Sequence, residues 1–484
     1  MDNMLPSVLQ TNAVDENQSA QIESVIQEAD NHSWVAGKFG KSKFVLAKKG
    51  SALSTDGVLM WKTKWDSYAP ATDRFASFVR TSGGCNLIKN CRLYMGGRLV
   101  SETREVGQKI ALDNNFIPYD ARVEILDEKL VGNHKYYYDA AGLLTLADDK
   151  MHSEVGFRSP TANEGATLEC AVRLDQLFPV LRDTMLPSTL SGDMIVEIDW
   201  EGVWGECMCE SGATAFTAAT RVFEVVRPRL HLDYITFADE VANALDAQIN
   251  SAEGMTIPYR QQVLVKSNLN ALGATSTNIA GRQDIELGFS GRSVMKIYVQ
   301  KVSSVTNALL LNTRSDGLLQ EKMQLIVNNR NLFDREVEQV SEMYSYLGQT
   351  ADKPAYLLAG TYNQVGLLTG NANTFAPDVN LPQLVLGTTA TASVRDNFQG
   401  RQRYLGVNLA KVRGGAAGSN DTPANSIQVG EAPMVLRLSY NSGSGGTDEP
   451  ENNAETQGAY ALNVWVECVR ALVIRNGVLD TINM

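Results

Sequence analysis

Three acidic residues at alternating positions form the clearest pattern that could do chemistry. Glu197, Asp199 and Glu201 alternate with Val196, Ile198 and Trp200 in a run that reads as a β-strand. Alternation would place the three carboxylates on one strand face, about 7 Å apart. Two carboxylates at such distances can hydrolyse a glycosidic bond, and three can bind calcium. The same face could instead form ion pairs with Lys or Arg, in solvent or between subunits.

Cysteine and histidine patterns are weaker candidates. Cys207 and Cys209 are close in sequence, and together with Cys85 and Cys91 they could supply the four sulfur ligands of a zinc site. The spacings are not those of common structural zinc sites. Buried free thiols explain these residues as well. No two histidines have a metal-ligand spacing, and no nucleophile elbow, phosphate-binding loop or dinucleotide fingerprint occurs. We therefore assign no catalytic, cofactor-binding or metal residues. The four histidines are His32, His134, His152 and His231.

Charge argues against a nucleic-acid-binding protein. The net charge is −12, and the first 37 residues contain no Lys or Arg. Phosphate binding needs clustered basic residues, so we expect no direct sequence-specific binding of nucleic acid. The chain shows no signal peptide and no apolar run near the ~20 residues of a transmembrane helix. Six cysteines are too sparse for a disulfide framework, which agrees with assembly in a cytosol-like compartment.

The stretch 322–347 predicts the local structure most clearly. Met323, Leu325 and Val327 alternate as in a strand, and Asn328-Asn329 supplies the left-handed backbone of a two-residue hairpin turn. Further on, Val337, Val340, Tyr344 and Leu347 recur at helical spacing. We expect a hairpin followed by an amphipathic helix.

This stretch has an earlier counterpart at 92–106, where Gly96-Gly97 takes the place of the Asn-Asn turn. Two further pairs of segments follow in the same order, and each of the three pairs is separated by roughly 240 residues. Those pairs are 194–200 with 434–440, and 223–227 with 466–470. Three ordered matches indicate a tandem duplication of one β-domain.

The duplication bears on the acidic candidates. Residues 197, 199 and 201 correspond to Arg437, Ser439 and Asn441 in the second unit. The strand face is polar in both units but not chemically alike. This favours a structural face over a catalytic one.

We expect four segments. Residues 1–37 form an acidic arm with a short helix, whose apolar face carries Ile22, Val25, Ile26 and Ala29. Residues 38–238 form the first β-domain, which Arg227-Pro228 closes. A connecting helix lies in 239–256, and residues 257–484 form the second β-domain. A short helix at 173–183 interrupts the first domain. Long Gly, Ala, Thr and Asn-rich stretches between 349 and 432, and another at 441–458, predict surface loops.

From about residue 40 to the end, the chain resembles double jelly-roll major capsid proteins of virophages, polinton-like viruses and nucleocytoplasmic large DNA viruses. The similarity is carried by QLIVNNRNLFDREVEQVSEMYSYL, by the strand at 293–299, by LNVWVECVRALVIRNG, and by the segment LDQLFPVLRDTMLPSTLSGDMIVEIDWE in the first half. The acidic arm departs from a basic genome-binding tail.

The resemblance implies an all-β fold of two tandem eight-stranded jelly rolls, at 38–238 and 257–484, with short helices in the connections. It implies a structural, non-catalytic subunit without cofactors that forms pseudo-hexameric homotrimers, and these tile an icosahedral shell. Implied partners are other copies of the chain, penton and minor capsid proteins, and an internal membrane. The implied location is the virion, assembled in the host cytoplasm or a viral factory, with the loops at 349–432 and 441–458 facing outward or toward neighbouring capsomers. The alternative from another class is a tandem β-sandwich protein that binds or cleaves carbohydrate.

Overall fold

The computed structural model describes most of both predicted units. The described residues are 19–34, 40–65, 76–78, 83–114, 136–138, 144–146, 167–190, 192–202, 208–210, 214–215, 223–268, 281–303, 321–337, 342, 345–346, 350, 404–410, 425–440 and 460–484.

Eight strands of the first half form two facing sheets. One sheet has the order β1-β16-β5-β11, and the other has the order β3-β13-β7-β8. Their bounds are β1 Ser19–Glu28, β3 Gly40–Val45, β5 Val58–Trp65, β7 Ile88–Met95, β8 Arg98–Arg104, β11 Thr167–Arg173, β13 Met194–Trp200 and β16 Phe223–Phe237. Shorter strands extend the sheets or form separate small ones: β2 Asn31–Ser33, β4 Ala52–Leu53, β6 Ala76–Phe78, β9 Tyr136–Tyr138, β10 Leu144–Leu146, β12 Leu186–Pro187, β14 Met208–Glu210 and β15 Thr214–Ala215.

The second half repeats this topology. Its sheets have the orders β17-β25-β19-β22 and β18-β24-β20-β21. In both halves the first strand pairs with the eighth, the eighth with the third and the third with the sixth, while the second, seventh, fourth and fifth form the other sheet. This is the jelly-roll topology, so the predicted duplication and fold class are confirmed. The bounds are β17 Met255–Asn268, β18 Gly281–Gly288, β19 Ser293–Ser303, β20 Glu321–Val327, β21 Arg330–Asn331, β22 Tyr404–Asn408, β23 Ile427–Gln428, β24 Met434–Tyr440, β25 Tyr460–Arg475 and β26 Val478–Asn483.

Both predicted hairpin turns form. Asn328 and Asn329 have φ of 53° and 60°, and Val327 pairs with Arg330 across them. Gly96 and Gly97 likewise have positive φ between β7 and β8. Left-handed backbone at both central positions gives the turn twist that flanking strands require, which is why Asn and Gly occupy them.

Short helices connect the strands. The predicted helix at 173–183 forms as α3 Leu174–Leu177 and α4 Val180–Asp183, and the predicted connecting helix forms as α5 Asp239–Ile249 with Leu245 and Ile249 buried. The 3-10 helix η3 (Gly83–Leu87) and α1 (Val106–Asn114) were not predicted.

The prediction of a helix in the N-terminal arm is wrong. Residues 19–28 form β1, which pairs antiparallel with β16 along its length. The spacing of Ile22, Val25, Ile26 and Ala29 fits a helix, but in the strand Val25 and Ala29 turn toward the core, while Ile22 and Ile26 face outward. The edge of β16 supplies backbone hydrogen-bond partners that decide the conformation.

One predicted domain boundary and one predicted helical position are also corrected. Arg227-Pro228 does not close the first unit, because β16 continues past it: Arg227 has φ of 49° within a bulge between Val226 and Arg229. A bulge accommodates Pro, which has no N–H to donate to the ladder. Val337 is not helical but bridges Met323 in β20. Of the predicted helix beyond it, Glu342, Ser345, Tyr346 and Thr350 are helical, and the remaining positions lie outside the described residues.

Each jelly roll has its own apolar core between its sheets. In the first, the rings of Trp61 and Trp200 lie 5.4 Å apart, centroid to centroid. The core of the first jelly roll also extends to residues of the second: Met255, Ile257, Tyr259, Leu472, Ile474 and Leu479. The two jelly rolls therefore share a continuous apolar junction.

Candidate functional site

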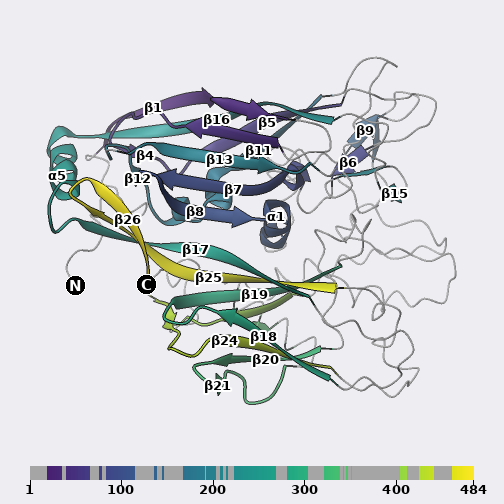
Figure 1. Cartoon of the computed structure of the whole chain (residues 1–484). Coiled ribbons are helices and arrows are strands. Elements are labelled where there is room, and N and C mark those ends of the chain that lie inside the picture. The colour runs from purple at the N-terminus through teal and green to yellow at the C-terminus, as the bar shows by residue number, and fades with distance from the viewer. Residues whose placement is uncertain are drawn as a thin grey trace.

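The junction between the jelly rolls is the most elaborate site that the described residues form. Strand β8 and helix α4 of the first jelly roll lie against β17 of the second, and α5 joins the two at one end (Figure 1). Apolar side chains from both sides bury one part of this junction, and polar side chains line the rest.

Two buried side chains of β17 donate hydrogen bonds to the backbone of β8. The hydroxyl of Tyr259 donates to the backbone carbonyl oxygen of Val100 at 2.7 Å. The side-chain amide of Gln261 donates to the backbone carbonyl oxygen of Glu102 at 2.8 Å. Val100 is the extra residue of a bulge in the β7–β8 ladder. Since a bulge disrupts the regular ladder, its carbonyl needs another donor, and the second jelly roll provides one.

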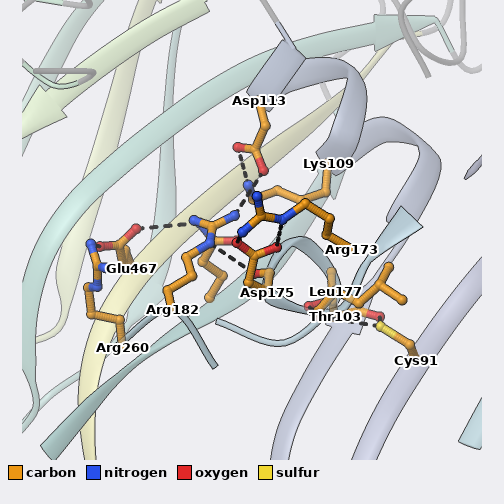
Figure 2. A network of polar contacts seen from close by, with 11 residues as sticks. Cys91, Thr103, Lys109, Asp113, Arg173, Asp175, Leu177, Arg182, Arg260 and Glu467 are labelled. Atoms are coloured by element: carbon orange, nitrogen blue, oxygen red, sulfur yellow. Dashed lines mark hydrogen bonds and ion pairs between the residues drawn. The ribbon is translucent and has the colours of Figure 1, made fainter. Parts of the chain in front are cut away.

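Buried charges line another part of the junction. Lys109, on α1, is 1% exposed and forms an ion pair with Asp113, which Arg182 of α4 approaches at 3.4 Å. Burial lowers the pKa of Lys109, and the negative charge of Asp113 opposes that shift. Arg182 lies between Asp113 and Glu467 of β25 (Figure 2).

The second jelly roll completes this network. Glu467 is 6% exposed, lies 3.8 Å from Arg260 and accepts a hydrogen bond from Gln262 at 3.4 Å. Two further contacts cross the junction: Lys266 with Glu105 at 2.6 Å, and Asn463 with Gln108 at 2.6 Å. A buried charge that loses its partner is costly, so this network favours one relative position of the two jelly rolls.

Two of the three acidic residues that the sequence singled out, Asp199 and Glu201, lie in ion pairs. Asp199 lies 2.8 Å from Arg92 and 3.5 Å from Lys41, and Glu201 lies 3.0 Å from Lys89. Glu197 stands opposite Lys43 and Arg92 in the register of its neighbouring strands. The carboxylates thus form a cross-strand charge ladder on the outer face of the β3-β13-β7-β8 sheet, as the structural interpretation predicted.

The second jelly roll reverses the charges of this ladder at one position. In the first jelly roll, Glu197 on β13 stands opposite Lys43 on β3. At the equivalent positions of the second, Arg437 on β24 stands opposite Asp284 on β18, and these two side chains form an ion pair at 2.9 Å. Hydrogen bonds from Arg282 and Arg437 lower the pKa of Asp284 to about 2. Opposite signs at equivalent positions indicate that pairing was kept while the individual residues diverged.

Four cysteines lie in the cores. Cys85, Cys91, Cys170 and Cys468 are buried, and burial raises the pKa of each thiol. Cys207 lies outside the described residues, and Cys209 lies in β14. Within the described ranges, His, Cys, Asp and Glu nowhere gather in threes in a way that could hold a metal ion.

His32 lies in hydrogen-bonded surroundings, and His231 lies on β16 opposite Ile26 and Val58. His32 contacts the Ser42 hydroxyl at 2.7 Å and the Val225 carbonyl at 2.8 Å. His134 and His152 lie outside the described residues. No helix in the described part of the chain has the length and apolar character to cross a membrane.

Most of 349–432 and all of 441–458 lie outside the described residues, but the strand register shows where long connections begin. Strand residues that border long connections pair with one another: Trp65 with Phe223, Asn268 with Ala461, and Ser303 with Tyr460. The strand ends that border them therefore lie at the end of both jelly rolls opposite α5 (Figure 1).

Comparison with solved structures identifies the fold. The chain matches a chain of the PBCV-1 virus capsid with a TM-score of 0.56 at 12% identity, covering 97% of this chain and 98% of that one. It matches a chain of the Sputnik virophage with a TM-score of 0.56 at 10% identity, covering 96% and 89%, and the Faustovirus major capsid protein with a TM-score of 0.53 at 10% identity, covering 94% and 91%. No protein-family model and no curated protein matches the sequence. In fold, the chain is a double jelly roll like these viral capsid proteins.

Proposed function

We propose that this protein is a viral major capsid protein that assembles as pseudo-hexameric homotrimers, which tile an icosahedral shell. The observation that carries the proposal is the repeated jelly-roll topology, joined by a buried junction into one two-lobed block. Structural neighbours from virus capsids, which align over nearly the whole chain, support it.

The geometry of the chain suits this role. Three copies of a two-lobed subunit around a threefold axis place six similar lobes in a ring, which gives a hexagonal outline. Closed threefold symmetry requires two different, complementary surfaces on each chain. Duplication followed by divergence of the two halves supplies surfaces that differ.

The proposal assigns no catalytic residue, and the ion pairs of Asp199 and Glu201 support a structural role. It places the protein in the virion after assembly in the host cytoplasm or a viral factory. Penton and minor capsid proteins, and an internal membrane, are the further proposed partners.

Native mass tests the proposal directly. Light scattering on the purified chain should give a species near three times 52.8 kDa, and negative-stain images of that fraction should show hexagonal particles or closed shells. A chain that remains monomeric at the highest soluble concentration, and forms no shells under any assembly condition, would overturn it. Glu197→Gln with Asp199→Asn should leave assembly intact, because the proposal gives neither carboxylate a catalytic role and Asp199 pairs with Arg92 and Lys41 of its own chain.

A further inference from the structure

One strand position is filled in the first jelly roll and empty in the second. Beyond the part of β16 that pairs with β5, β4 pairs with β16 and β12 pairs with β4, so two short strands extend the sheet. Beyond the part of β25 that pairs with β19, β26 pairs with β25. Among the described residues, no strand takes the position beside β26 that β12 takes beside β4.

The free edge of β26 carries backbone groups that have no strand partner in the described part of the chain. Met484 donates its backbone N–H to Val469, so positions 478, 480 and 482 also point theirs toward β25, while 479, 481 and 483 point theirs away. The N–H of Thr481 donates instead to the carboxylate of its neighbour Asp480 at 2.9 Å. An added strand pairs with an open edge of this kind.

The outward face of β26 is also uncovered. Val478 is 66% exposed and Ile482 is 45% exposed, whereas both residues of β4 and both residues of β12 are buried. The two jelly rolls therefore differ at this position in pairing and in burial, and both differences indicate that the second jelly roll lacks one strand here.

Residues 1–18 of the same chain are attached close to this position. Ser19, the first residue of β1, pairs with Phe237 just ahead of α5. The turn between β25 and β26 is bound to the other end of α5, because Gly477 donates its N–H to the carbonyl oxygen of Ile249 at 3.0 Å. α5 has 11 residues and is about 16 Å long (Figure 1). Eighteen extended residues span up to about 60 Å, so the segment can reach β26.

The composition of this segment suits the free edge. Residues 4–14, MLPSVLQTNAV, are uncharged and contain Val, Leu and Thr, and acidic residues flank them at positions 2, 15 and 16. Cations border β26: Arg475 stands opposite Val478, and Arg98 lies 3.9 Å from Asp480. An apolar strand with acidic flanks therefore meets an apolar edge with basic neighbours.

A lipid surface fits the same position less well. Backbone groups on an open edge need hydrogen-bond partners, which an added strand supplies and acyl chains do not. The neighbouring helix α5 also carries Asp239, Glu240 and Asp246, whose charges repel anionic head groups.

We propose that a strand formed from residues 4–14 pairs with the free edge of β26 in the same chain. It takes in the second jelly roll the position that β12 takes in the first. Because β1 tethers the segment, its effective concentration at β26 is high, and the contact forms within one chain. The contact covers an edge that would otherwise pair with other chains. It does not depend on the proposed capsid function.

Proline substitutions in the full chain test the contact from both sides. Leu9→Pro removes an N–H from the proposed strand, and Thr481→Pro removes one from the free edge without removing a backbone hydrogen bond to β25. Asn3→Pro lies outside the proposed strand and is the matched control. We expect Leu9→Pro to accelerate hydrogen exchange at 478–484, and Thr481→Pro to accelerate it at 4–14, each by at least about tenfold. Asn3→Pro should change either rate by less than about twofold.

Exchange at 460–475, measured in the same samples, shows that the fold survives each substitution. Unprotected amides at 4–14 in the wild-type chain, or exchange at 478–484 that Leu9→Pro leaves unchanged, would refute the contact. Protection at 4–14 that appears only as the protein concentration rises would place the segment on another copy and refute a contact within one chain. Light scattering on these samples tests the capsid proposal separately, because a contact within one chain persists whether or not chains associate.

Discussion

The hydroxyl of Tyr259 is the most specific single link between the two jelly rolls, so its removal should loosen the junction. Tyr259 is fully buried, and its hydroxyl donates a 2.7 Å hydrogen bond to the bulged carbonyl of Val100. Tyr259→Phe keeps the ring and its packing. It leaves the carbonyl without that donor in a buried place.

The expected cost follows from what the carbonyl loses. An unsatisfied buried acceptor costs about 1–3 kcal/mol, and local relaxation around the bulge should keep the loss near 1–2 kcal/mol. For a cooperative unit of 150–250 residues, each kcal/mol lowers Tm by roughly 2–4 °C. We therefore expect a decrease of about 2–8 °C in the first thermal transition.

Tyr298→Phe is the matched control for this variant. Its hydroxyl donates to the carbonyl of Thr350 at 3.3 Å, within the second jelly roll and at a half-buried position. Calorimetry on the dissociated chain, with guanidinium unfolding as a second measure, should show a larger loss for Tyr259→Phe. Equal losses, or a change below about 0.3 kcal/mol for Tyr259→Phe, would refute the assignment of this hydroxyl as a junction contact.

Three other predictions concern a turn, an ion pair and the thiols. Gly192→Ala should destabilise the first jelly roll by about 1–3 kcal/mol in guanidinium unfolding, because its Cβ would lie 2.1 Å from the Cα of Gly96 and force the backbone apart; wild-type stability would contradict this. The pKa of Asp284 is about 2 in the folded chain, below its unfolded value of about 4, so its pairing stabilises the fold above pH 4 and is lost as the pH falls toward 2. At a site this exposed the effect is about 0.5 kcal/mol, and Asp284→Asn should remove it from the acid limb of a stability–pH curve; an unchanged limb would exclude this pair as its source. Thiol labelling at pH 8 with peptide mapping should leave four buried cysteines unmodified until the chain unfolds: Cys85, Cys91, Cys170 and Cys468. The reason is that burial raises the pKa of each thiol and keeps the reagent away from it. Modification of any of them in the native chain would contradict this burial.

Alternation and turn chemistry were enough to predict most of the fold. Strands such as Met194–Trp200 and Met434–Tyr440 have one buried face, so apolar residues recur at every second position of their sequences. The Asn328-Asn329 turn was readable because few residues tolerate positive φ. The duplication followed because both kinds of signal recur in the same order.

Tertiary contacts decided the elements that the sequence did not predict. Residues 19–28 carry apolar side chains at helical spacing, and only the open edge of β16 makes them a strand. Helix α1 was missed because Lys109, a charged residue, occupies a fully buried position and obscures its apolar face. The junction left no signal because Glu467 and Gln262 alternate with apolar residues, as they would on a solvated strand face.

Charge compensation at the junction sets how the two jelly rolls sit against each other. Glu467 is 6% exposed; Arg260 of its own jelly roll lies 3.8 Å away, and Arg182 of the first jelly roll lies between Glu467 and Asp113 (Figure 2). Lys109 is buried beside them and pairs with Asp113 of its own helix. A shift of one jelly roll against the other would move Arg182 away from Glu467 and leave a buried acid with less compensating charge, which costs more than the loss of an exposed ion pair. The charged part of the junction therefore fixes the relative position of the two lobes, while the apolar part supplies the buried area that holds them together.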